Sequence, residues 1–135
     1  MPDPVPVFDG HNDIVLKIAA AGAARDRLWL EGEGAGHLDL PRMLKAGFAG
    51  GMFAVYIPSP DTGDLAALER LMDAPPYNLP LPDLINHRTA QPVAVEVLGH
   101  LMWMERAAEG RFRWCRTARD IRAAMAEGVI AGVIH

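Results

Sequence analysis

The sequence has a single cysteine, Cys115, among its 135 residues. One cysteine cannot form a disulfide within the chain, so the fold has no internal disulfide framework and a reducing compartment is favoured. The sequence also shows no basic leader followed by an apolar segment, and its apolar runs are too short to cross a bilayer. We therefore expect a cytoplasmic protein with no membrane partner.

Positive charge is scarce as well. The chain has 13 Lys and Arg against 17 Asp and Glu, a formal net charge of −4. This balance provides no electrostatic basis for a nucleic-acid partner. The glycines form neither a G-x-G-x-x-G nor a phosphate-loop pattern, so we predict no nucleotide-binding residues. With 50% hydrophobic and 22% charged residues, the composition is typical of one globular domain spanning residues 1–135.

Short apolar runs alternate with segments that have helical periodicity. Strands are predicted where β-prone runs end in loops, and helices where apolar residues recur every three or four positions. The predicted strands are 5–8, 52–57, 111–115 and 129–135, and the predicted helices are 14–24, 41–46, 64–72, 91–109 and 118–127. No Asn-Gly hairpin signal separates the strands, so the pattern predicts an α/β fold with a parallel sheet.

A proline-rich segment interrupts this alternation. Seven of the eleven prolines lie between Pro58 and Pro92. We expect an extended excursion in residues 58–92 with one short helix, and its position suggests a place beside a substrate mouth.

The stretch "VFDGHND" at 7–13 places His11 and Asp13 two residues apart at the end of an apolar run. Side chains two apart in a strand point to the same face, and an imidazole beside a carboxylate suits Zn²⁺. The alternative is structural: Asp13 caps the following helix and His11 bonds to nearby backbone. Spacing alone leaves both interpretations open.

A second H-x-D triplet, His37 and Asp39, precedes Leu40-Pro41, where we expect Asp39 to cap a helix. His135 ends an apolar strand, a place where a ligand can lie, but the sequence does not decide its role. Structural or solvent-exposed positions are predicted for the remaining candidates, His87, His100, Cys115, Trp29, Trp103 and Trp114.

Two blocks carry a resemblance to a known family. They are "FDGHND" at 8–13 and "DLPRMLKAGFAGGMFAVYIP" at 39–58, and the final "EGVIAGVIH" fits the same pattern. In this order they resemble the membrane (renal-type) dipeptidases, peptidase family M19.

The resemblance implies a (β/α)₈ barrel with two zinc ions at the C-terminal ends of its strands. His11 and Asp13 would bind one zinc, a glutamate would bridge both ions, and later histidines would complete the second. The implied activity is hydrolysis of a dipeptide or a related small amide by a metal-activated hydroxide.

The family pattern continues past the residues present. A complete barrel of this kind has about 250 residues. The bridging glutamate and later histidines would follow His135, so we expect an N-terminal portion of the barrel, with no catalytic residue of its own and an incomplete zinc site. We predict that the chain alone is inactive. Its unpaired sheet edge favours association into a homo-oligomer.

Two alternatives remain. The chain could be a non-catalytic binding or oligomerisation module derived from the barrel. It could also belong to another class of zinc amidohydrolase, but those carry H-x-H at the first strand, and Asp13 in place of a second histidine disfavours this alternative.

Overall fold

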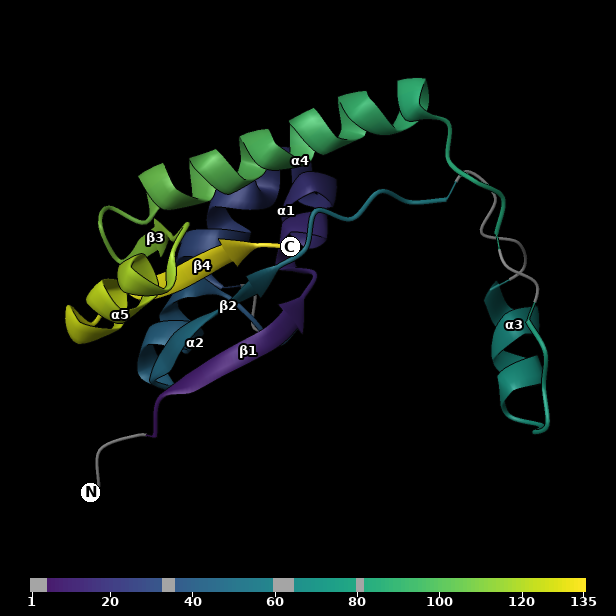
Figure 1. Ribbon diagram of the computed structural model, residues 1–135, viewed down its shortest axis with the longest axis horizontal. Helices are drawn as coiled ribbons and strands as arrows, with labels where there is room; N and C mark the ends of the chain where they lie inside the picture. Colours follow the sequence, from purple (N-terminus) through teal and green to yellow (C-terminus); the bar gives the residue numbers. More distant parts are fainter. Residues whose placement is uncertain (1–4, 33–35, 60–64, 80–81) are drawn as a thin grey trace.

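A four-stranded parallel sheet lies at the centre of the fold (Figure 1). The computed structural model describes residues 5–32, 36–59, 65–79 and 82–135. The strands are β1 (Val7–Asn12), β2 (Phe48–Phe53), β3 (Phe112–Trp114) and β4 (Ile130–Ile134). Their order across the sheet is β1-β2-β4-β3. The predicted α/β fold with a parallel sheet is confirmed.

Most of the helices pack around this sheet. They are α1 (Ile14–Ala21), α2 (Leu40–Lys45), α3 (Leu65–Met72), α4 (His87–Ala107) and α5 (Ala118–Ala126), with a short 3₁₀ turn, η1 (Gly22–Ala24), and a π-helical turn, η2 (Arg27–Glu31). Among the described residues, no helix is both long enough and apolar enough to span a membrane.

The larger hydrophobic core lies between the sheet and α1, α2, η2 and α4. Phe112 is at its centre, with the rings of Trp29, Phe53 and Trp114 packed edge-to-face around it or one another at centroid distances of 4.7–5.6 Å. The buried Trp29 donates its indole N–H to the Met104 carbonyl of α4 at 3.1 Å. The tryptophans at 29 and 114 are therefore packing residues, as predicted.

A smaller cluster lies under α5. It joins Ala124 of α5 to Ala131 of β4 and to Cys115, which follows β3. Ala131 follows Ile130, which belongs to the larger core, and successive residues of a strand point to opposite faces. The sheet is therefore covered on both faces near β4, as its continuous apolar sequence requires.

Several predicted boundaries were wrong. β1 runs through Asp9-Gly10 to Asn12, beyond the predicted end at residue 8, and β2 begins at Phe48 rather than Met52. Helix α4 begins at His87 and contains Pro92. Asn86 caps it by accepting a hydrogen bond from the Arg88 amide at 2.8 Å, so the helix starts one turn before the proline.

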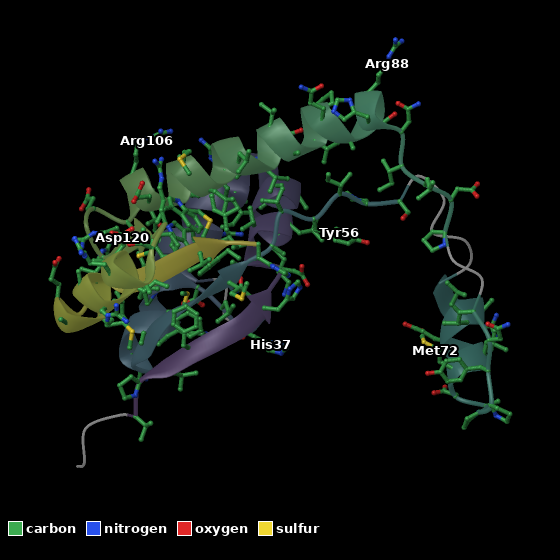
Figure 2. The ribbon with its side chains drawn as sticks, in the orientation of Figure 1. His37, Tyr56, Met72, Arg88, Arg106 and Asp120 are labelled. Carbon is green, nitrogen blue, oxygen red and sulfur yellow. The ribbon has the colours of Figure 1, made fainter. Side chains whose placement is uncertain are left out.

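The described part of the proline-rich excursion contains α3, which stands apart from the sheet (Figures 1 and 2). The predicted short helix is confirmed from Leu65 to Met72, and Asp64 lies outside the described residues. The excursion ends earlier than expected, because 87–92 belong to α4.

Candidate metal centre

The C-terminal ends of three strands meet at one edge of the sheet. The backbone amide of Ala54 donates to the carbonyl of Asn12 at 3.0 Å, which ties β2 to β1. The amide of His135 donates to Phe53 at 3.0 Å, and Val55 donates to His135 at 2.7 Å, which ties β4 to β2. His11 and His135, 124 positions apart in sequence, are therefore held at the same edge. Parallel α/β folds place their sites at this edge.

The predicted pair is brought together here. His11 Nε2 lies 3.4 Å from Asp13 Oδ1, and both side chains are about half exposed, at 52% and 51%. The sequence suggested that regular strand alternation would place the two side chains on the same face, but the structure brings them together in another way. Between Asp9 and Asn12 the pairing of β1 with β2 is irregular, with two residues, Gly10 and His11, opposite one. Bulges of this kind turn a side chain out of the regular alternation.

Asp13 lies beyond the last residue of β1 and precedes α1. Its carboxylate makes no capping hydrogen bond to α1, although its backbone carbonyl accepts from the Leu16 amide at 3.1 Å. The alternative in which the Asp13 side chain caps the helix was therefore wrong. The carboxylate is free to interact with His11 and with a ligand.

The geometry of this pair fits a zinc ion. A tetrahedral Zn²⁺ with bonds of about 2.0–2.1 Å to nitrogen and oxygen holds two such ligands about 3.3 Å apart. The distance of 3.4 Å between His11 Nε2 and Asp13 Oδ1 is close to this value. Within the described ranges, however, no three His, Cys, Asp or Glu side chains come together as a metal-binding group. The pair could contribute two ligands, which is fewer than a closed zinc site needs.

A cavity of about 470 Å³ lies beside the pair. Its wall includes Asp9, His11, Asp13, Lys17 and His37, which lies beside β1 (Figure 2). The cavity therefore offers both carboxylates and cationic or imidazole groups to a small polar ligand.

The Asn12 side chain links β1 to β2 near this edge, a role that the sequence did not predict. The buried Asn12 side chain donates to Asp9 Oδ2 at 2.9 Å and to the Met52 carbonyl at 3.2 Å. Its Oδ1 is buried with no hydrogen-bond partner among the described residues. The available signal in the sequence was its position between His11 and Asp13. Its burial became visible only in the structure, where a buried asparagine is seldom without a bonding role.

In the second H-x-D triplet, Asp39 is structural, as predicted. Asp39 is buried and accepts a hydrogen bond from the Arg42 amide at 2.8 Å, which caps α2, and its Oδ2 lies 3.2 Å from Arg42 Nε. The side chain is therefore fully engaged in holding the start of α2.

His135 is the residue that the sequence left undecided. Its ring packs edge-to-face on the His11 ring, with centroids 5.2 Å apart and ring planes at 88°. The remaining candidates lie elsewhere. His87 starts α4 and is exposed, His100 is half-buried on α4, and Cys115 is buried.

Cys115 packs as a small apolar residue. Burial, followed by the charge of Asp120, raises the pKa of its thiol above the ordinary value. The thiol is therefore protonated at neutral pH, which disfavours a nucleophilic role.

Comparison with known families decides where this arrangement belongs. Residues 2–135 match the sequence profile of the membrane dipeptidase family, peptidase family M19. The chain belongs to family M19. Of the M19 chain, 98% superposes on the crystal structure of a metallo peptidase from Rhodobacter sphaeroides liganded with a phosphinate mimic of the dipeptide L-Ala-D-Ala, with 56% identity and a TM-score of 0.91. It also superposes on the structure of the metallo peptidase dipeptidase AC over 98% of its length, with 54% identity and a TM-score of 0.89.

The M19 chain is shorter than these relatives. It spans 38% of the Rhodobacter sphaeroides chain and 37% of the dipeptidase AC chain. A curated relative, an uncharacterized protein in the PQQ-III 3' region of Acinetobacter calcoaceticus, is 43% identical in an alignment of 68 residues; the match covers 42% of the M19 chain and 18% of the relative. The fold is accordingly part of a dipeptidase-type barrel, as the sequence predicted.

Proposed function

We propose that this chain supplies the first portion of a zinc-dependent dipeptidase site, in which His11 and Asp13 bind one metal ion. The observation that carries the proposal is the 3.4 Å distance between His11 Nε2 and Asp13 Oδ1 at the C-terminal edge of a parallel sheet. Membership of family M19 supports a metallopeptidase, and the dipeptide mimic bound to the Rhodobacter sphaeroides protein supports a dipeptide as the substrate class.

Each residue contributes to this function in a definable way. His11 offers an imidazole nitrogen and Asp13 a carboxylate oxygen, the ligand types that zinc prefers. Asn12 holds Asp9 and the Met52 carbonyl, and so fixes the end of β1 from which His11 projects. When bound, zinc supplies the Lewis-acid chemistry that allows water to attack an amide carbonyl near neutral pH.

We further propose that the chain by itself binds zinc weakly and does not turn over dipeptides. Two protein ligands leave a tetrahedral ion incompletely held, and catalytic zinc sites use three. Within the described residues, no third side chain joins the pair as a ligand.

The test measures zinc affinity by titration and bound zinc by elemental analysis, in the wild-type chain and in His11→Ala and Asp13→Asn. Removing a residue that hydrogen-bonds to a metal ligand typically weakens metal binding about 10- to 100-fold. Removing the ligand itself should weaken metal binding at least as much. His87→Ala, at an exposed position on α4, is the matched control and should bind as the wild type does. Equal zinc binding by wild type and His11→Ala would overturn the proposal.

The same protein preparation also tests the proposal that the chain alone is inactive. No hydrolysis of Gly-Leu is expected from the chain alone with excess zinc. Two stoichiometric zinc ions together with Gly-Leu hydrolysis would contradict the proposed inactivity of the chain and would eliminate a non-catalytic role.

A non-catalytic, self-associating module is the second candidate, and one observation favours it. In the described part of the sheet β1 is an edge strand, and its Val7 and Phe8 are 52% and 42% exposed. Edges of this kind pair with other chains. Light scattering after size-exclusion chromatography would show a zinc-independent dimer that Val7→Lys dissociates; a monomer at all concentrations would exclude this candidate.

A further inference from the structure

The imidazole of His11 has an aromatic neighbour from another strand. The His135 ring meets it edge-to-face at 5.2 Å and 88°. This arrangement is the one that aromatic rings prefer, because the positive edge of one ring faces the negative face of the other. The two rings come from β1 and from the residue that follows β4, and β2 lies between these strands.

The backbone of His135 is fixed where the contact needs it. Its amide donates to the Phe53 carbonyl at 3.0 Å, and its carbonyl accepts from the Val55 amide at 2.7 Å. Both hydrogen bonds go to the end of β2 and the segment after it. The exposed His135 side chain is thus carried by a backbone whose amide and carbonyl are both hydrogen-bonded, whereas His11 lies in an irregular part of β1.

A role as a third metal ligand does not agree with the geometry. In the part of the chain that the structure describes, His135 does not form a group of three metal-binding side chains with His11 and Asp13. What the His135 ring does contact is the His11 ring itself.

We propose that His135 is a positioning residue, whose ring holds the His11 imidazole in the orientation that directs Nε2 toward Asp13. The proposal rests on the proposed function, since orientation matters only if His11 binds metal. An exposed imidazole that is oriented before the metal arrives loses less rotamer freedom on binding, so His135 raises zinc affinity without touching the ion.

The first measurement uses the metal-free chain and does not depend on zinc. In ¹³C- and ¹⁵N-labelled protein at constant pH, cross-relaxation between the ring protons of His11 and His135 is expected, and His135→Ala should shift the His11 ring signals. His135→Phe, which keeps an aromatic ring at this position, should retain the cross-relaxation. Absence of the ring-to-ring contact in the wild type would overturn the proposal.

The second measurement is a zinc chloride titration of the same proteins, followed through the His11 ring signals. His135→Ala should weaken zinc binding about 2- to 12-fold, the factor that corresponds to one edge-to-face pair. His135→Phe should bind within about twofold of wild type, because it replaces the ring but offers no ligand nitrogen. His87→Ala is again the control, and circular dichroism confirms that each variant is folded.

The outcomes separate the two proposals. If His135→Phe lost as much affinity as His135→Ala, a ring nitrogen rather than a ring face would be required, and the positioning role would be wrong. Unchanged affinity in both variants would also overturn it. If zinc failed to bind even the wild type, the proposed function would fail, while the metal-free ring contact would be tested separately by the first measurement.

Discussion

The Asn12 side chain makes two hydrogen bonds, one within β1 and one that connects β1 to β2. Its amide nitrogen reaches both Asp9 Oδ2 and the Met52 carbonyl, and the group is buried. Removing one partner of a buried hydrogen bond costs more free energy than the bond contributes on balance to stability. The reason is that the remaining partner stays desolvated. At this position the Met52 carbonyl and Asp9 Oδ2 would each lose the Asn12 amide as a donor.

We therefore predict that Asn12→Ala lowers the free energy of unfolding by about 1–3 kcal/mol, the cost of leaving a buried polar partner unsatisfied. Urea denaturation measures this change. Asn78→Ala, at an exposed position, should change the value by less than about 0.5 kcal/mol. Equal stability of the two variants would show that the Asn12 bonds do not matter to the fold.

At the scale of elements, α5 has its N-terminus fixed by a capping box. Thr117 Oγ1 accepts from the Asp120 amide at 3.2 Å, and Asp120 Oδ2 accepts from the Thr117 amide at 2.9 Å and from the Arg116 amide at 3.0 Å. The Arg116 backbone hydrogen bond, followed by that of the Thr117 side chain, holds the pKa of Asp120 below its ordinary value. The charged form is the one that the cap binds.

The direction of this pKa change determines how the free energy of unfolding depends on pH. Because the pKa of Asp120 is lower in the folded state, the unfolded chain takes up the proton first as the pH falls. The stabilisation of the folded state by the Asp120 carboxylate is complete above about pH 5. It is lost as the pH falls below about 4, toward the pKa of Asp120 in the folded state.

Asp120→Asn should consequently be less stable than wild type at pH 7, and this difference should narrow as the pH is lowered from 5 to about 3. Thermal unfolding across that range measures it. The exposed Asp83, which lies outside any helix cap, provides the control Asp83→Asn. A gap between wild type and Asp120→Asn that widened in acid would contradict the assignment.

At the scale of the whole molecule, the sheet and α4 meet across a glycine. A Cβ added to Gly132 would lie 2.4 Å from Phe112 Cζ and 2.7 Å from Trp114 Cζ3. Trp114 in turn donates its indole N–H to the Leu101 carbonyl of α4 at 2.7 Å. The absence of a side chain at Gly132 therefore leaves the space that the Phe112 and Trp114 rings occupy beside β4.

Gly132→Ala is expected to destabilise the fold by about 1–3 kcal/mol, the usual cost of overpacking a core. The comparison is Gly99→Ala in α4, where the added Cβ meets nothing within 4 Å beyond its own helix backbone and chain neighbours. This variant should be neutral or stabilising by up to about 1 kcal/mol. Urea denaturation of both variants, with near-ultraviolet circular dichroism to follow the aromatic rings, measures the contrast. Similar responses at the two glycines would contradict this account of the core.

Part of this protein is determined by the sequence alone, because the interactions concerned join neighbours in the chain. The capping box of Thr117 and Asp120, the Asp39 cap of α2 and the alternation of strands with helices are of this kind. The pairing of His11 with Asp13 was also predictable, and its role in binding metal stays a prediction. These features require only hydrogen bonds or contacts within a few residues.

The tertiary structure decided the rest. The order β1-β2-β4-β3, the irregularity that turns His11 out of the alternation, the burial of Asn12 and the packing of His135 on His11 all depend on strands brought together from distant parts of the chain. Register and pairing are set by which faces bury the most apolar surface without steric conflict, and Gly132 beside Phe112 is one such condition. That balance belongs to the folded molecule, and no local stretch of sequence contains it.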